Sequence, residues 1–172
     1  MDERLKMIYE RRSVRAYQDR EIDESTVQEL LEAAMAAPSA VAKDPWHFIV
    51  VRNPDTLKKT AEALPYGGML GQAPLGIIVC GDIEQAHDGQ ESYLLQDCSA
   101  AIENLLLAAS ALGIGSCWLG VHPREERVAH LNTVFGLPEH IIPVSAIALG
   151  YPDESKPART RYRDDAVHVE RW

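Results

Sequence analysis

Leu75-Gly76-Ile77-Ile78-Val79-Cys80 is a run of six residues without a polar side chain. A short apolar run that does not alternate with polar residues is typical of a β-strand that is covered on both faces. Covering both faces takes one layer of structure on each side of the strand. This stretch therefore predicts a sheet that lies between two outer layers.

Helices and further strands are expected on either side of this run. Segments rich in β-branched, aromatic or other apolar residues predict strands, and apolar residues at helical spacing predict helices. The expected strands cover 47–51, 75–80, 116–121 and 141–149, and the expected helices cover 3–11, about 25–37, 54–63, 93–112 and a segment between Pro123 and Gly136. Alternating helices and about four strands predict one domain over residues 1–172, with a three-layer α/β or α+β arrangement.

Some details of the chain carry more specific predictions. Ser25 followed by Gln28 has the spacing of a capping box, which starts the second helix at Ser25. Pro143 has no N–H to donate, so it favours an edge or entry position in the last strand. Small apolar residues on most sides of the helix at 93–112 predict burial all round, in a core or against a second subunit. Residues 151–172 show no periodicity and predict an extended arm that lies on something else, such as a partner chain.

The charges are unevenly distributed along the chain. The net charge is −9, yet residues 11–15 hold three arginines and no acid, and residues 156–163 hold four cations and no acid. Without these seven cations the chain would stand at −16. Two cationic islands on an acidic chain predict a site for a small, concentrated anion such as a phosphomonoester, although two solvated basic turns would have the same composition. The acidic total argues against a general nucleic-acid binder.

Other function classes lack their usual patterns. Three widely spaced cysteines in apolar surroundings predict reduced, buried thiols in a cytoplasmic protein. The start has no apolar core of a signal peptide, and the uncharged run from Leu105 to Val121 contains three glycines, so we expect a helix, a turn and a strand there and no membrane partner. The six histidines show no metal-ligand spacing, and no metal is predicted. Trp46 and Trp118 fit either a core or the lining of a planar cavity.

Five segments, taken in order, resemble the FMN-dependent nitroreductase-like flavoproteins. They are Arg11 to Tyr17, Ala37 to Phe48, Asp97 to Ala109, Leu112 to Gly120 and Arg159 to Tyr162. The resemblance implies a nitroreductase-like fold, with a central, mainly antiparallel sheet flanked by helices and an extended C-terminal arm. It also implies an intertwined homodimer with FMN at the interface.

The same resemblance implies roles for individual residues. Arg11, Ser13, Arg159 and Arg161, with Arg12 alongside, would hold the FMN phosphate, and Arg15 would lie near the pyrimidine edge of the flavin. The Pro38-Ser39-Ala40 turn would contact the ring and the ribityl chain, and the backbone near Leu119 and Gly120, next to Trp118, would meet the central ring. No catalytic acid–base residue is expected, because the flavin carries the chemistry.

Two departures from the family pattern affect the flavin contacts. Ala42 and Asp44 stand where many relatives have Asn and Gln, and an ionised Asp44 cannot donate a hydrogen bond as Gln does. The loop from Leu64 to Gln72 offers only Tyr66 and glycines in place of the Asn and Lys of many relatives. The stretch from Asp82 to Ser92 is short, which argues against the large substrate lid of the dehalogenating relatives.

The resemblance thus implies an FMN-dependent oxidoreductase that takes hydride from NAD(P)H and passes electrons to a small electron-poor acceptor such as a nitroaromatic or a quinone. A second hypothesis, motivated by Ala42 and Asp44, is a flavin-binding or redox-sensing module with little turnover. A third is a flavin-free protein that binds another phosphorylated anion.

Overall fold

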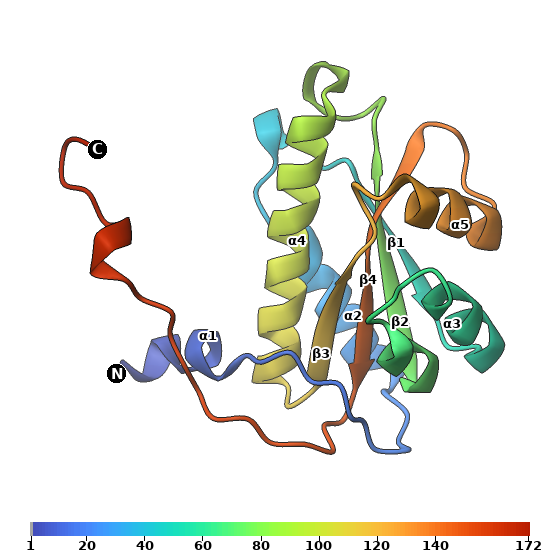
Figure 1. The fold of residues 1–172 in the computed structure, drawn as a ribbon, viewed down its shortest axis with the longest axis horizontal. Coiled ribbons are helices and arrows are strands. Elements are labelled where there is room, and N and C mark those ends of the chain that lie inside the picture. Colours follow the sequence, from blue (N-terminus) through green and yellow to red (C-terminus); the bar gives the residue numbers. More distant parts are fainter. Residues whose placement is uncertain (1) are drawn as a thin grey trace.

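The computed structural model describes residues 2–172 and has an antiparallel sheet at its centre (Figure 1). Its strands are β1 (Trp46–Val51), β2 (Leu75–Asp82), β3 (Gly115–Gly120) and β4 (Ile141–Gly150). They lie in the order β1-β2-β4-β3, and every neighbouring pair is antiparallel. The mainly antiparallel sheet that the family resemblance implied is confirmed.

Helices cover both faces of this sheet, as Figure 1 shows. On one side lie α2 (Glu24–Met35) and α4 (Glu91–Ala111), and on the other lie α3 (Pro54–Ala61), α5 (Glu125–Phe135) and the 3-10 turn η3 (Gly68–Gln72). The short α1 (Lys6–Glu10) follows the 3-10 turn η1 (Glu3–Leu5) and contacts α4 from outside the layers. The three-layer α+β prediction is confirmed.

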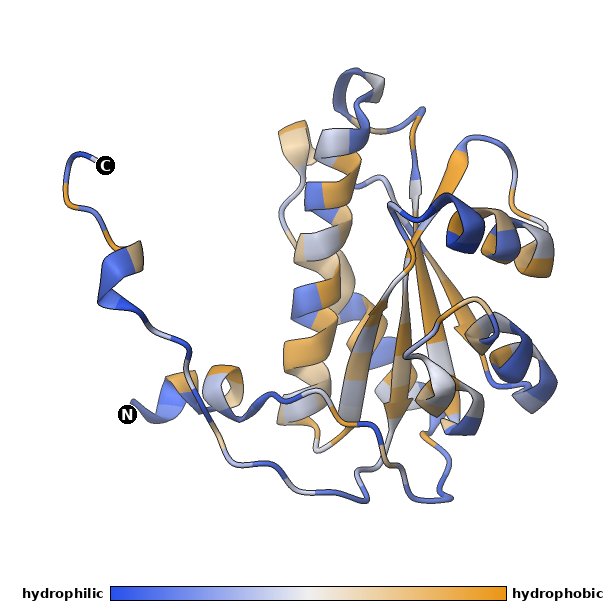
Figure 2. Cartoon of the chain, viewed as in Figure 1, coloured by the Kyte–Doolittle hydropathy of each residue, from blue (hydrophilic) through white to orange (hydrophobic). Residues whose placement is uncertain are grey.

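The run from Leu75 to Cys80 is covered on both faces because its side chains alternate between two hydrophobic clusters. Ile77 and Val79 are fully buried against the α2 and α4 layer, whereas Ile78 and Cys80 are buried against α3 and η3 on the other side. Figure 2 shows hydrophobic residues along the strands and a mixture of hydrophobic and hydrophilic residues on the helices that cover them. Within this chain one face of α4 is buried and the other is partly exposed, so burial all round would require the second subunit that the sequence analysis allowed for.

The predicted capping box is wrong. The helix α2 begins one residue earlier than Ser25, and Asp23 is its N-cap, accepting the backbone N–H of Thr26 at 2.7 Å. The Ser25 hydroxyl donates to the same carboxylate, and the Gln28 side chain binds Glu32. The hydrogen bonds that Asp23 accepts, first from the Thr26 N–H and then from the Ser25 hydroxyl, lower its pKa to about 2. A carboxylate accepts charge-assisted hydrogen bonds that are stronger than those of a hydroxyl, so the acid takes the cap.

Pro143 takes the second of its two predicted positions, the entry of its strand. Its strand β4 lies between β2 and β3, so it is not an edge strand. Pro143 nevertheless lies near the start of β4, before β3 pairs with this strand at Ser145, and next to an irregularity opposite Val79 and Cys80. The missing N–H therefore interrupts no pairing with β3.

The segment after β4 forms the extended arm that was predicted. Its first part lies along the N-terminal segment, and beyond residue 160 it is exposed and projects away from the sheet (Figure 1). Val167, Val169 and Trp172 expose most of their apolar surface. Within residues 2–172, no helix has the length and apolar character needed to cross a membrane.

Candidate functional site

The two cationic islands are brought together by a pairing of the N-terminal segment with the start of the arm. Backbone hydrogen bonds of 2.9 to 3.1 Å run in opposite order along the two segments and join Gln18 to Tyr151, Ala16 to Asp153 and Tyr9 to Arg159. Between them, Lys156 Nζ donates to the Ser13 carbonyl at 2.6 Å, and Arg12 donates to the Pro157 carbonyl. The first island is thereby held opposite the second.

The strand β3 fixes where this paired ribbon lies. The Val14 N–H donates to the Ser116 carbonyl at 2.9 Å, so residues 13 and 14 run along the free edge of β3. Gly115 allows this approach, because a Cβ there would lie 2.7 Å from Cγ1 of Val14. The ribbon is therefore attached to the sheet at its β3 edge.

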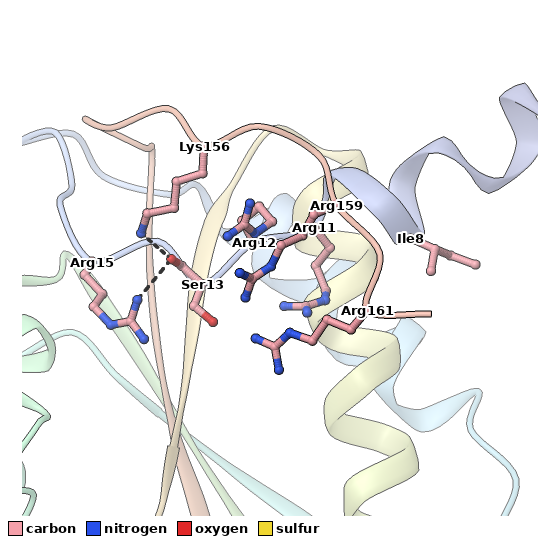
Figure 3. Close-up of a pocket in the computed structure, with 8 residues that line it drawn as sticks. All are labelled: Ile8, Arg11, Arg12, Ser13, Arg15, Lys156, Arg159 and Arg161. Atoms are coloured by element: carbon pink, nitrogen blue, oxygen red, sulfur yellow. Dashed lines mark hydrogen bonds between the residues drawn. The ribbon is translucent and has the colours of Figure 1, made fainter. Parts of the chain in front are cut away.

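A cationic cavity of about 510 Å³ opens between the ribbon segments (Figure 3). It is lined by Ile8, Arg11, Arg12, Ser13, Arg15, Lys156, Arg159 and Arg161. The cations come from both islands, and Figure 3 shows the guanidinium groups of Arg11, Arg12, Arg159 and Arg161 on one side of the Ser13 hydroxyl and Arg15 on the other. A hydroxyl among guanidinium groups is a donor set suited to the oxygens of a phosphate.

Most of these charges have no acid to balance them. Arg11 pairs with Glu103 at 3.2 Å, and Lys156 pairs with Glu154 at 2.7 Å. Among residues 2–172, the guanidinium groups of Arg12, Arg15, Arg159 and Arg161 form no ion pair with a carboxylate.

The unpaired guanidinium groups repel one another, and this repulsion affects the pKa of Arg159. Arg161 and then Arg12 lower the pKa of Arg159, because a second and a third positive charge lie close to it. Gathering like charges costs free energy that a bound anion offsets. The residues present therefore fit a phosphate group.

A second cavity, of about 230 Å³, adjoins the first, since Arg15 lines both. Its walls are the end of β3, the loop before η3, one side chain of the N-terminal segment and one side chain of α5. The lining residues are Arg15, Leu64, Pro65, Tyr66, Gly67, Cys117, Trp118, Leu119, Gly120 and Arg127. Trp118 exposes 38% of its surface here, whereas Trp46 is buried in the core. Two aromatic side chains and an apolar floor suit a planar ring.

Most of the predicted site residues are therefore close together, but one group is not. The structure places Arg11, Arg12, Ser13, Arg159 and Arg161 in the first cavity, Trp118, Leu119 and Gly120 in the second, and Arg15 in both. Pro38, Ser39 and Ala40 line neither cavity. They lie between α2 and β1, and β1 is the sheet edge opposite to β3.

The turn that contains these three residues is held by contacts of its own. The Ala40 N–H donates to a buried carboxylate oxygen of Asp97 in α4 at 2.8 Å. Ser39 and Asp44 exchange two hydrogen bonds across the loop. Asp44, with Val41 and Ala42, has a left-handed φ between 48° and 55°, which is uncommon for residues other than glycine. The contacts of Asp44 thus stabilise the loop in which it lies.

Sequence reasoning missed two of the cations that line the cavities. Lys156 was counted in its island but not assigned to the site, and its contact with Ser13 depends on a pairing that has no sequence signal. Arg127 lines the second cavity, and nothing in the spacing of α5 singles it out.

Two other chemistries are disfavoured by the geometry. Burial raises the pKa of the Cys117 thiol, so this residue in the cavity wall is a poor thiolate nucleophile. Among residues 2–172, one group with metal-ligand atoms within 4.8 Å of one another contains Asp82, Glu84 and His140. Both carboxylate oxygens of Asp82 already accept hydrogen bonds from the turn that follows β2.

Comparison with known proteins gives consistent results. The model of the nitroreductase family matches residues 8–65 and 58–151. A protein of Archaeoglobus fulgidus, described as a candidate NADH dehydrogenase/NAD(P)H nitroreductase, is 50% identical over the whole length of both chains. A crystal structure of a protein of the same description from Parabacteroides distasonis superposes with a TM-score of 0.94 at 36% identity, covering both chains completely.

One further structure was solved with a cofactor. It is a candidate nitroreductase from Desulfovibrio desulfuricans in complex with FMN, 30% identical, with a TM-score of 0.85 over 100% of this chain and 99% of the other. This structure, the family model and the A. fulgidus protein that is 50% identical all indicate the same family. The chain belongs to the nitroreductase family.

Proposed function

We propose that this protein is an FMN-dependent oxidoreductase that takes hydride from NAD(P)H and passes electrons to a small electron-poor acceptor, such as a nitroaromatic or a quinone. The observation that carries the proposal is the cluster of unpaired guanidinium groups beside a ring-sized cavity, with Arg15 in the walls of both. FMN joins a phosphate dianion to a planar ring and matches this combination. The D. desulfuricans relative, solved with FMN, supports the choice of cofactor.

Within this proposal, the first cavity binds the FMN phosphate and the second cavity orients the flavin ring. Arg12, Arg159 and Arg161 neutralise the phosphate, and the Ser13 hydroxyl adds a hydrogen bond. Arg11 contributes less charge, because it is already paired with Glu103.

Around the ring, this chain supplies electrostatics and shape. FMN, when bound, supplies the two-electron chemistry. Arg15, whose Nη1 donates to the Ser13 carbonyl at 3.4 Å, holds a fixed positive charge near the place where negative charge gathers on reduction. Trp118 lines the second cavity and offers an aromatic side chain against which the ring can pack. No side chain of this chain needs to transfer a proton.

We further propose that the complete site requires a homodimer. The Pro38-Ser39-Ala40 turn can contact the same flavin only if it comes from a second copy, because in one chain it lies away from both cavities. The partly exposed face of α4 and the apolar residues of the arm support such an assembly. Three buried free thiols support a cytoplasmic location.

The test is the visible absorption spectrum of the purified protein, followed by identification of the released chromophore. We expect a bound FMN spectrum that NADPH or NADH bleaches and a quinone restores. A spectrum that is not bleached by either nucleotide would favour the flavin-binding module. A colourless protein that does not take up added FMN would refute the flavin proposal and return attention to another phosphorylated anion. Light scattering on the same sample measures whether the protein is a dimer.

A further inference from the structure

The side chain of Arg127 makes a single, well-defined hydrogen bond. It lies in the first turn of α5, and its Nη1 donates to the carbonyl oxygen of Gly120, the last residue of β3, at 2.8 Å. Its Nε is buried and has no hydrogen-bond partner in the described part of the chain. A buried unpaired N–H costs stability, and such groups in native proteins call for an explanation.

The orientation of the Gly120 backbone follows from the pairing of β3. In an antiparallel pair, the N–H and C=O of one residue point to the same side, and successive residues alternate between the partner strand and the other side. The Ser116 carbonyl accepts from Val14, so Ser116 points away from β4. Gly120 lies four residues further on and therefore also presents its N–H and C=O at the free edge.

Arg127 binds the carbonyl, one of the two backbone polar groups that Gly120 presents at the free edge of β3. Its bond to the carbonyl leaves the N–H of the same residue at the edge that borders the second cavity. A Cβ on Gly120 would meet no atom within 4 Å apart from its chain neighbours, so among residues 2–172 the space on that side of its backbone is open. Gly120 is the last residue of β3 and has no side chain, so the hydrogen bond from Arg127 restrains its backbone at the point where the strand pairing ends.

Arg127 also adds charge to the second cavity. Arg15 and Arg127 are the cations among its lining residues, and that lining contains no acid. A guanidinium group beside a ring that gains negative charge on reduction favours the reduced form over the oxidised form.

We propose that Arg127 is a positioning residue that holds the Gly120 backbone so that its N–H faces the flavin ring, and whose charge raises the reduction potential of the bound FMN. This inference rests on the proposed function. A merely structural tie between α5 and β3 would affect folding stability but would leave the potential unchanged.

The test compares Arg127→Met, Arg127→Lys and the control Arg124→Met. Methionine has similar length but neither a donor nor a charge, whereas lysine keeps both. Arg124 is an exposed residue of the same helix start, three positions earlier, and it lines neither cavity. For each protein, fluorescence titration gives the FMN dissociation constant, dye equilibration gives the midpoint potential of the bound flavin, and thermal melting of the apoprotein gives its stability.

We expect Arg127→Met to weaken FMN binding about tenfold, the loss that corresponds to one hydrogen bond, and to lower the midpoint potential. Arg127→Lys is expected to recover most of both, and Arg124→Met to match the wild type. The inference is overturned if Arg127→Met keeps the wild-type affinity and potential, or if only its melting temperature falls. If the wild-type protein binds no FMN, the proposed function fails, and this inference fails with it.

Discussion

Riboflavin, which is FMN without its phosphate, is expected to bind this protein about a thousandfold more weakly than FMN. Three guanidinium groups of the first cavity, those of Arg12, Arg159 and Arg161, have no carboxylate partner among residues 2–172. One charge-assisted hydrogen bond in a partly exposed site is worth about a factor of ten in affinity. Solvent screens exposed charges, so each such bond contributes near the lower end of its usual range, and the preference for FMN is greatest at low ionic strength.

The assay is quenching of flavin fluorescence by the apoprotein, with FMN and riboflavin as ligands. We expect Arg161→Ala to weaken FMN binding about tenfold and to leave riboflavin binding unchanged. The matched control is Arg163→Ala, because Arg163 is on the same arm, pairs with Asp165 at 3.7 Å and lines neither cavity. Added salt is expected to reduce the preference for FMN. Equal affinities for the two flavins, or a loss of affinity for both on Arg161→Ala, would refute the phosphate assignment.

Three further predictions concern stability, each measured by urea denaturation. Asp97→Ala should lower the free energy of unfolding by about 2 kcal/mol, because the Ala40 N–H loses its acceptor, whereas Asp97→Asn keeps an acceptor and should lose less; equal losses would contradict this account. Burial raises the pKa of the Cys80 thiol from 9.0 to about 12, so on raising the pH the unfolded chain loses this proton before the folded chain does. The free energy of unfolding should therefore fall between pH 9 and 12, and it should fall less steeply in Cys80→Ala. Gly115→Ala should destabilise by about 1 to 3 kcal/mol, since its Cβ would meet Val14 at 2.7 Å, and an unchanged midpoint would argue against that contact.

The layers of the fold could be predicted because burial leaves a local pattern. The apolar runs predicted at 47–51, 75–80 and 141–149 lie within β1, β2 and β4, and the run at 116–121 overlaps β3. Local competition decided one detail that was wrong, because Asp23 displaced Ser25 as the cap of α2. For Pro143 the sequence allowed an edge or an entry position, and the strand order decided for the entry.

The cationic part of the site could be predicted from composition alone, because a residue type carried the signal. The arginines stood out because they are concentrated on an acidic chain, and the cavity brings both islands together. The pairing that joins them has irregular backbone and no period, so no window of sequence contains it. Arg127 stayed hidden for the same reason, because its contact with Gly120 depends on how α5 turns back onto β3.

The ribbon that joins the two islands also bears on how the protein matures. Contacts such as Lys156 with Ser13 and Arg12 with Pro157 join residues 143 and 145 positions apart in the chain. Closing so long a loop is entropically costly, and the sheet must first bring the two segments near each other. A ligand held by both segments therefore cannot act as a nucleus for folding. We expect the chain to fold before it acquires its cofactor, so that synthesis of the protein and supply of FMN can be separated in time.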